Sequence, residues 1–337
     1  MAQEPVKPPS RRRFLFLMGG AGGLAALGLA RRLSNRLNSV TRTSWALGAD
    51  VSLTVLHDDR RAAEAAIDDA FAELERIEGA MSLYRPHSQL CRLNRDGALE
   101  NPDPYLVEVL RAATAVSERS DGAFDATVQP LWKLYADAKK AGRLPDADAV
   151  REATGRVDWR KVEVAPDRIR FRADGMAVTL NGIAQGFAAD RVRAALQARG
   201  VRHALVNTGE FGSLGRKSDG TPWTVGIQHP RRPDAYLALA ALEERFLSTS
   251  GDYATSFSDD FRHNHIFDPR TGLSPTEFSS VTVLARTGME ADALTKVLFV
   301  GGLGRGLDLV RAVPGADALC VLKDGRTMLT DGFPRIA

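Results

Sequence analysis

Cysteine is scarce in this chain of 337 residues, which contains only Cys91 and Cys320. Two thiols could form one disulfide in an oxidising compartment, but they make no disulfide framework, and they exclude a zinc site built from cysteines. Several catalytic signatures are also missing, because the sequence contains no H-E-x-x-H, C-x-x-C, G-x-S-x-G or G-x-x-x-x-G-K-[ST] motif. The chemistries that depend on these motifs are therefore not indicated.

The chain also lacks a dinucleotide fingerprint and a strong charge bias. The glycine-rich run at 301–306 does not fit G-x-G-x-x-G and follows a helical pattern, so it should separate two helices. The formal net charge is +3, and residues 1–30 alone carry four basic residues against one acidic residue. The remainder is therefore near neutral, and nothing suggests a DNA or other nucleic-acid partner.

The N-terminus carries a predicted export signal. Residues 10–15 (SRRRFL) place a basic cluster directly before an apolar run that ends at Ala30 and is diluted by five glycines. This run is too short and too rich in glycine for a typical transmembrane helix, and the whole pattern resembles a twin-arginine signal. We predict a signal peptide at 1–30, cleavage near Arg31 and a periplasmic mature protein; the alternative is an uncleaved inner-membrane anchor.

The pattern of apolar residues predicts one mature domain with two lobes at 44–337, after a linker at 31–43. Helical spacing predicts helices at 59–79, 104–122 and 289–302 and another that ends at Gly200, with a loop at 81–97. Strand-like patterns lie at 44–57, 203–208, 223–228, 235–242, 245–250, 263–267 and 279–285. Helices and strands interleave without a regular βαβ repeat, which predicts an α+β (mixed α/β) fold.

Residues 249–272 concentrate polar and ionisable side chains. Two polar turns, at 250–252 and 268–272, flank a strand-like run that contains His263 and His265. Residues two apart in a strand share a face, so both imidazoles should point the same way. Taken alone, this stretch is more typical of a hairpin with a polar rim than of a catalytic site.

Other short segments could approach a phosphate or a cation. Residues 181–186 (NGIAQG) precede a helix whose free amides would favour an anion, although ordinary glycine-rich turns share this pattern. Residues 207–210 (NTGE) form a second backbone-exposing turn after a strand. Asp292 lies between Ala291 and Ala293, which leave room for a hard cation, but a solvated carboxylate would look the same.

Eight ordered segments resemble the ApbE family of FAD:protein FMN transferases. They read MSLYRPHSQLCRLN, GAFDATVQPLW, LNGIAQGFAADRV, ALVNTGEFGSLG, WTVGIQHP, STSGDY, HNHIFDPRTG and ADALTKVLFVGG. The resemblance covers roughly residues 44–325, and its most specific parts are TSGDY, HIFDPRTG and FDATV. LNGIAQG and NTGE look most like the NosX-type branch, which accompanies nitrous-oxide reduction.

The resemblance implies an ApbE-like, T-fold-like architecture, with mixed sheets flanked by helices and FAD in a cleft between two lobes. It implies a Mg²⁺-dependent transfer of FMN from FAD, through a phosphoester bond, to a Thr or Ser of a partner protein, with release of AMP. The partner is commonly a membrane-bound redox subunit. Attack on phosphorus needs positioning, charge neutralisation and a base, and histidine is a suitable base near neutral pH.

Position by position, the resemblance assigns the base to His265, with His263 a weaker choice. It assigns the magnesium carboxylate to Asp292 and a second oxygen ligand to the Ala184 carbonyl. The remaining positions that match cofactor-binding or pocket-shaping motifs are Met81, Tyr84, Asp125, Thr127, Gly182, Gln185, Gly209, Thr249 and Asp268. The alternative for Tyr84 is a half-buried aromatic residue of a loop.

Two positions depart from the family pattern. The family has a Thr metal ligand four residues after this Asp, but that position is Lys296, while Thr295 comes one residue early and points about 100° away. We keep Thr295 as a candidate metal ligand and Lys296 as a candidate cofactor-binding residue. Gln185 replaces the usual Lys. We hypothesise that the Lys296 ammonium reaches the pyrophosphate or pairs with Asp292 and partly replaces metal charge; the alternative is that it extends into solvent.

Three functions therefore compete. The first is an exported FMN transferase, the second a non-catalytic FAD-binding or assembly protein, and the third an FAD pyrophosphatase. The unusual Lys296 and Gln185 favour the second, whereas the intact His265, Asp292 and TSGDY motif oppose it.

Overall fold

The computed structural model describes residues 37–336. The predicted signal peptide at 1–30 lies outside these residues. Strand β1 begins at Asn38, inside the segment predicted to be a linker, so regular structure starts before residue 44. Within residues 37–336, no helix has both the length and the apolar character that a bilayer-spanning segment requires.

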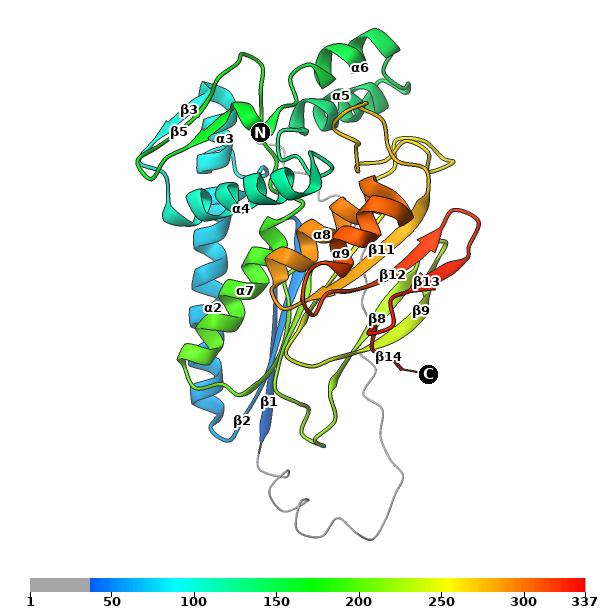
Figure 1. Cartoon of the computed structure of the whole chain (residues 1–337). Coiled ribbons are helices and arrows are strands. Elements are labelled where there is room, and N and C mark those ends of the chain that lie inside the picture. Colours follow the sequence, from blue (N-terminus) through cyan, green and yellow to red (C-terminus); the bar gives the residue numbers. More distant parts are fainter. Residues whose placement is uncertain (1–36, 337) are drawn as a thin grey trace, which may run out of the picture.

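A large antiparallel sheet forms the centre of the molecule (Figure 1). Its eight strands follow the order β1-β2-β6-β7-β10-β11-β12-β13, and each neighbouring pair is antiparallel. The strands are β1 (Asn38–Ala46), β2 (Ala49–His57), β6 (His203–Asn207), β7 (Phe211–Leu214), β10 (Phe246–Gly251), β11 (Phe278–Ala285), β12 (Asp317–Leu322) and β13 (Thr327–Leu329).

The prediction of a single strand at 44–57 is wrong, because these residues belong to a hairpin. β1 and β2 pair in register up to Ala46 and Ala49, and Leu47 and Gly48 alone make the turn. Both turn residues have positive φ, 51° and 74°, as a tight hairpin turn requires. Apolar alternation continues through such a short turn, so the pattern alone did not reveal it.

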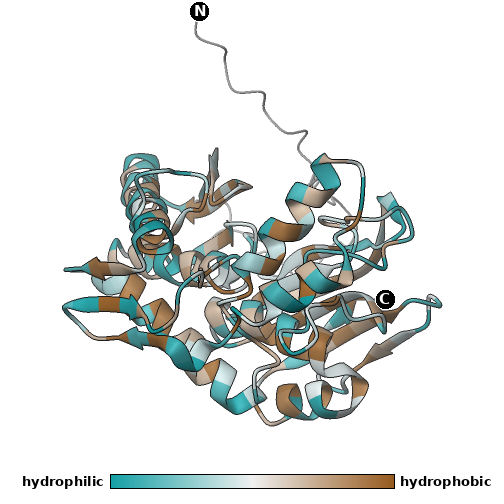
Figure 2. Ribbon diagram, turned by 90° about the horizontal axis from the view of Figure 1, so that it is seen from above, coloured by the Kyte–Doolittle hydropathy of each residue, from teal (hydrophilic) through white to brown (hydrophobic). Residues whose placement is uncertain are grey.

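Helices cover one face of the large sheet. α2 (Arg60–Met81) packs against α7 (Ala184–Ala198), which packs against α8 (Gly288–Gly301), and α4 (Pro104–Ser120) crosses the upper end of α2 (Figure 1). In Figure 2 the helices carry both hydrophobic and hydrophilic residues; α2 and α4 bury one side and expose the other, whereas no residue of α8 is exposed. The predicted helices at 59–79, 104–122 and 289–302 are confirmed. The π-helical turn η2 (Gly302–Gly306) separates α8 from α9 (Leu307–Arg311), as predicted.

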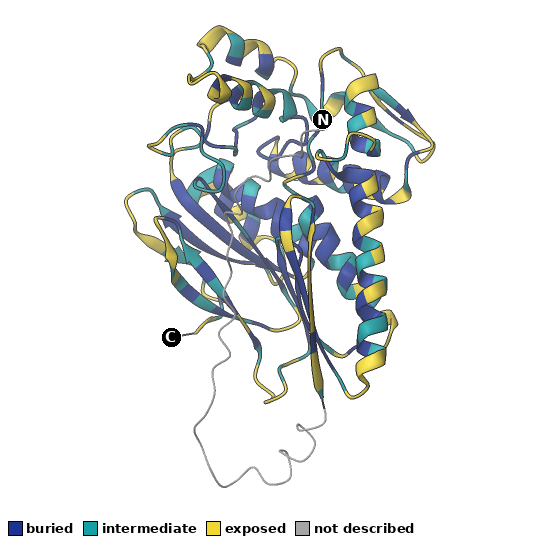
Figure 3. Cartoon of the chain, turned by 180° about the vertical axis from the view of Figure 1, so that it is seen from behind, coloured by how far each residue is buried: buried dark blue, intermediate teal, exposed yellow. Residues whose placement is uncertain are grey.

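The other face of the large sheet is covered by a small sheet of order β14-β9-β8 (Figure 3). Its strands are β8 (Trp223–His229), β9 (Arg232–Leu242) and β14 (Arg335–Ile336). Trp223, Val225 and Leu242 of this sheet belong to one buried cluster with Leu205 and Leu247 of the large sheet. The two sheets therefore share a core.

Smaller elements complete one end of the molecule. They are α3 (Gln89–Asp96), β3 (Ala98–Glu100), α5 (Gln129–Lys140), α6 (Ala147–Thr154), η1 (Trp159–Lys161), β4 (Val162–Val164) and β5 (Arg168–Phe171). The predicted loop at 81–97 is wrong in part, because α3 lies inside it. The Ser88 side chain caps this helix by accepting the Cys91 N–H, and Leu90 and Leu93 are buried.

Candidate functional site

A cavity of about 1760 Å³ opens where the large sheet, the small sheet and the ends of α7 and α8 meet. Of the residues predicted from the sequence, its walls include Tyr84, Asp125, Gly182, Gln185, Gly209, Thr249, His265 and Lys296. Met81, Thr127, Ala184, Asp268, Asp292 and Thr295 are absent from its lining. The fold thus gathers segments from six regions of the sequence at one site, and the other predicted residues lie behind the cavity wall.

His265 lies in an irregular loop, so the predicted strand at 263–267 is wrong. The only regular pairing here is an isolated bridge between Asn264 and Ser256. His265 lines the cavity, whereas the ring of His263 stacks on Tyr135 with centroids 6.1 Å apart. The two histidines therefore do not share a face, because the loop lacks the alternation of a strand.

The His265 ring is oriented by the backbone of Thr255. Its Nδ1 lies 3.3 Å from the Thr255 carbonyl oxygen, which also accepts the His265 N–H at 3.0 Å. A carbonyl oxygen only accepts hydrogen bonds, so Nδ1 carries the proton in this arrangement. The lone pair of the neutral ring is then on Nε2, as a general base requires.

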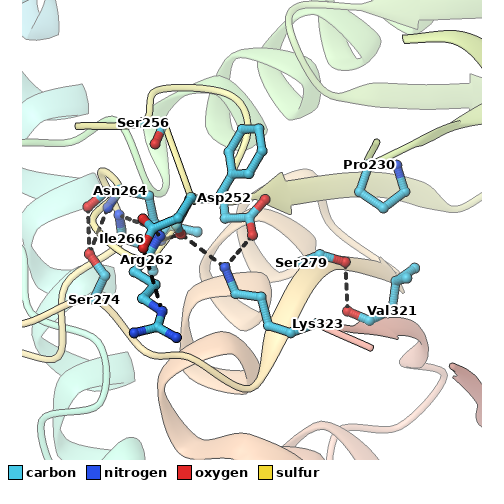
Figure 4. A network of polar contacts seen from close by, with 12 residues as sticks. Pro230, Asp252, Ser256, Arg262, Asn264, Ile266, Ser274, Ser279, Val321 and Lys323 are labelled. Atoms are coloured by element: carbon cyan, nitrogen blue, oxygen red, sulfur yellow. Dashed lines mark hydrogen bonds and ion pairs between the residues drawn. The ribbon is translucent and has the colours of Figure 1, made fainter. Parts of the chain in front are cut away.

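Asn264 holds the loop through its side chain and its backbone, with Ser274 and Ile266 as partners (Figure 4). Its buried side chain accepts the Ile266 N–H at 3.1 Å and donates to the Phe261 carbonyl at 3.3 Å. Ser274 Oγ accepts the Asn264 N–H at 2.9 Å and donates to the Asn264 carbonyl at 2.8 Å. Asn264 was not predicted from the sequence. The available signal was its position directly between the two histidines and two residues before the apolar pair Ile266 and Phe267.

Asp252, in the TSGDY motif, anchors the same loop through a buried ion cluster (Figure 4). Its side chain is completely buried and accepts two hydrogen bonds of 2.7 Å from Arg231. Lys323 pairs with the same carboxylate and donates to the Phe261 carbonyl at 2.9 Å. The sequence indicated the motif but not these partners, which lie 21 and 71 residues away.

Asp125 and Thr127 act as a pair at the cavity wall. Asp125 Oδ1 accepts the Thr127 N–H at 2.7 Å and its hydroxyl at 2.6 Å, and Oδ2 accepts the Trp159 N–H at 3.1 Å. Burial raises the pKa of the Asp125 carboxyl above its ordinary value, and these three hydrogen bonds oppose the shift. Thr127 therefore orients Asp125, which is the member of the pair that lines the cavity.

The start of α7 abuts the turn at 207–210. Gly209 has φ = +99°, and a Cβ there would lie 2.5 Å from Gln185 Nε2. Thr208 Oγ1 donates to the Gln185 carbonyl at 2.9 Å. The positive φ therefore favours glycine at 209, and the Gln185 amide packs against its backbone.

The remaining predicted positions take different roles. Tyr84 is 63% exposed and lines the cavity, so it is not merely a half-buried loop residue, while Met81 is buried near it. Thr249 Oγ1 bonds Thr282 Oγ1 at 2.9 Å. Asp268 accepts the Arg270 N–H at 3.0 Å and pairs with the Arg270 side chain, so it shapes the turn beside the cavity.

Asp292 is buried at the contact between α7 and α8. Its Oδ2 accepts the Gly186 N–H at 3.1 Å, and its Oδ1 forms an ion pair with Lys296 Nζ. The side chain of Asp292 is 0% exposed and that of Lys296 is 20% exposed. Two alternatives from the sequence are therefore wrong: Asp292 is not solvated, and Lys296 does not extend into solvent.

Thr295 points away from the Asp292 carboxylate. Its hydroxyl donates to the Asp292 carbonyl at 2.7 Å and shares a hydrogen bond of 2.7 Å with Ser250 Oγ. This bond joins α8 to β10, and Ser250 belongs to the TSGDY motif. The contact therefore links the predicted metal corner to the segment that leads to His265.

The donors at this corner fit a Mg²⁺ ion that takes most of its ligands from phosphate and water. Within residues 37–336, no group of three or more His, Cys, Asp or Glu side chains could enclose a metal. Mg²⁺ is usually bound by one or two carboxylates together with waters and substrate phosphates. Asp292, a buried carboxylate that already holds a cation, meets that requirement, and the Ala184 carbonyl lies on the adjoining first turn of α7.

The model of the ApbE family matches residues 47–320. The chain belongs to the ApbE family. It is 32% identical to the FAD:protein FMN transferase of Treponema pallidum, a match of 321 residues that covers 88% of each chain. It is 30% identical to an enzyme of the same name from Klebsiella pneumoniae, with 84% of each chain covered.

Solved structures of the ApbE family share the fold. The apo form of the flavinyl transferase ApbE of Pseudomonas stutzeri superposes with a TM-score of 0.76 at 30% identity, covering 88% of this chain and 95% of the other. The ApbE protein of Thermotoga maritima gives a TM-score of 0.75 at 28% identity, covering 87% and 97%. The predicted mixed α/β fold of the ApbE type is thus confirmed.

Proposed function

We propose that this protein transfers FMN from FAD to a Thr or Ser hydroxyl of a partner protein and releases AMP. One observation carries the proposal: His265 and Lys296, the lysine that pairs with Asp292, both line one large cavity. Relatives named FAD:protein FMN transferase support it.

The size of the cavity agrees with two occupants. Pockets for small molecules usually measure about 300–1,000 Å³, whereas this one measures about 1760 Å³. The additional volume suits a dinucleotide together with the acceptor segment that brings the hydroxyl.

In the proposed reaction the acceptor hydroxyl oxygen attacks the phosphorus atom on the FMN side of the pyrophosphate. A new O–P bond forms, the bond from that phosphorus to the bridging oxygen breaks, and AMP leaves with the bridging oxygen. His265 Nε2 takes the hydroxyl proton, and the Thr255 carbonyl holds the ring through Nδ1. Lys296 stabilises negative charge on the phosphates. Mg²⁺, held by Asp292 with the Ala184 carbonyl as a second ligand, would supply further charge neutralisation.

The proposed setting follows from the N-terminus. A twin-arginine signal at 1–30 would deliver the folded protein to the periplasm, where the acceptor would be a membrane-bound redox subunit. Replacing Arg11 and Arg12 by Lys should abolish export, and unchanged export would contradict this part of the proposal.

The function is tested with the purified mature protein, FAD, Mg²⁺ and a membrane fraction from cells that lack the enzyme. Flavin fluorescence that stays on a protein band in a denaturing gel, with release of AMP, indicates the transferase. Release of AMP and free FMN without labelled protein indicates a pyrophosphatase. Bound but intact FAD indicates the non-catalytic binding protein. Replacement of His265 by Ala should abolish labelling, and near-wild-type turnover would remove it as the base.

A further inference from the structure

We propose that Lys296 is an exchangeable internal cation: a divalent ion that binds at Asp292 displaces the ammonium, which then moves to the FAD pyrophosphate. The proposal rests on the proposed function, because it identifies how the metal and the substrate are coupled at the same site.

The Lys296 side chain lies between the cavity and the Asp292 carboxylate. Lys296 lines the cavity, whereas Asp292 is completely buried behind it. Lys296 Nζ contacts Asp292 twice, through Oδ1 and, at 3.2 Å, through the main-chain carbonyl. An ion that arrives from the cavity therefore meets the ammonium before it meets the carboxylate.

Each oxygen of the Asp292 carboxylate already has a partner. Oδ2 accepts the Gly186 N–H, so Oδ1 is the oxygen that remains for a cation, and Lys296 holds it. The Thr295 hydroxyl is directed to the Asp292 carbonyl and to Ser250. Mg²⁺ and the ammonium thus compete for one oxygen, and their mutual repulsion prevents both from binding it together.

The Lys296 side chain borders the cavity, so it has space to move away from Asp292. Its stem passes over Gly182, where a Cβ would lie 3.3 Å from Lys296 Cε. Gly182 also lines the cavity and lies just before the start of α7. A small movement of the flexible stem therefore takes the ammonium from Asp292 into the cavity beside Gly182, where the pyrophosphate of FAD would reach it.

The exchange predicts effects of opposite sign on the two ligands. Lys296→Met removes the competitor, so Mn²⁺ should bind the flavin-free protein about tenfold more tightly or better than wild type. The same substitution removes the cation that reaches the pyrophosphate, so FAD should bind about tenfold more weakly at saturating Mn²⁺. A lysine with only a structural role would not tighten the metal and weaken the flavin together.

Mn²⁺ binding to the full chain is measured by electron paramagnetic resonance, and FAD binding by quenching of flavin fluorescence. Lys139→Met is the matched control, because Lys139 also lines the cavity but bonds the Ser256 carbonyl rather than Asp292. It should leave the Mn²⁺ affinity unchanged, and Lys296→Gln, which keeps most of the length, should repeat the effect of Lys296→Met. Asp292→Asn should abolish the Mn²⁺ signal.

Unchanged or weaker Mn²⁺ binding by both Lys296 variants overturns the exchange, as does wild-type Mn²⁺ affinity in Asp292→Asn. Equal tightening by Lys139→Met would also overturn it, because the effect would then be one of general charge. These measurements contain no acceptor and no turnover. Failure of the exchange is thus separate from failure of FMN transfer, which the labelling assay reports.

Discussion

The ion cluster around Asp252 should be the most sensitive electrostatic point in the loop that carries His265. Asp252→Ala removes a completely buried carboxylate from two cations, Arg231 and Lys323. Lys323 then loses the partner that holds it against the Phe261 carbonyl, so the anchor of the loop loosens as well.

The magnitude follows from what remains after the substitution. Removing one partner of a buried ion pair costs about 3–5 kcal/mol, because it leaves an uncompensated charge. Here the side chains of Arg231 and Lys323 keep 33% and 24% exposure, so both cations can recover some hydration. We therefore expect a loss near the lower limit, about 3 kcal/mol of the free energy of unfolding.

Urea unfolding of the full mature chain measures this loss, provided that the m value stays constant. Asp260→Ala is the control, since Asp260 lies in the same loop but pairs with Arg262 at 3.5 Å with both side chains mostly exposed. Exposed pairs contribute about 0–1 kcal/mol, so this control should remain within that range. In the double variant Asp252→Ala, Lys323→Met, part of the loss should be recovered. Equal stability of the Asp252 and Asp260 variants would refute the reasoning.

Three further predictions concern positioning, packing and pH. Asn264→Ala should lower kcat about 10–100-fold while the KM for FAD changes less than about threefold, because His265 shifts but the cavity remains; steady-state kinetics decides, and an unchanged kcat contradicts it. Gly186→Ala should destabilise the fold by about 2 kcal/mol or more in urea, because its Cβ would lie 2.1 Å from a carbonyl oxygen of α8; stability within 0.5 kcal/mol (about the noise of such series) would contradict it. Burial raises the pKa of Cys320 to about 12, so it stays protonated through neutral and mildly alkaline pH, and iodoacetamide at pH 8 should leave it intact in mass spectra while the partly exposed Cys91 reacts; rapid alkylation of Cys320 in the native protein would contradict it.

The elements with long periodic patterns could be predicted from the sequence. α2 and α4 followed from apolar residues at helical spacing, and the large buried strand β11 from a run of apolar residues. α3 was missed because it has only eight residues, too few for a periodic signal. The disulfide left open for Cys91 and Cys320 does not form, since both thiols are free.

Site residues that belong to a short sequence motif could be predicted. Residues whose role depends on partners far away in the sequence could not. TSGDY and HIFDPRTG located the loop, but a strand pattern at 263–267 suggested a shared face that an Asn264-centred loop abolishes. The partners of Asp252 are Arg231, in the turn before β9, and Lys323, directly after β12. Only the antiparallel order of the sheets brings these segments together, and no local pattern encodes it.

Distant contacts also change how we interpret Gln185 and Lys296, the two positions that depart from the pattern expected for the family. A Lys lost at 185 and gained at 296 looked from the sequence like damage to a catalytic corner. In the structure both side chains line one cavity near the start of α7, Gln185 beside Gly209 and Lys296 over Gly182. The cavity therefore retains a lysine at this end, supplied from α8 instead of α7. Because phosphoryl transfer depends on charge placed at the phosphates rather than on which helix carries it, the substitution pair is compatible with catalysis and does not by itself favour a binding protein.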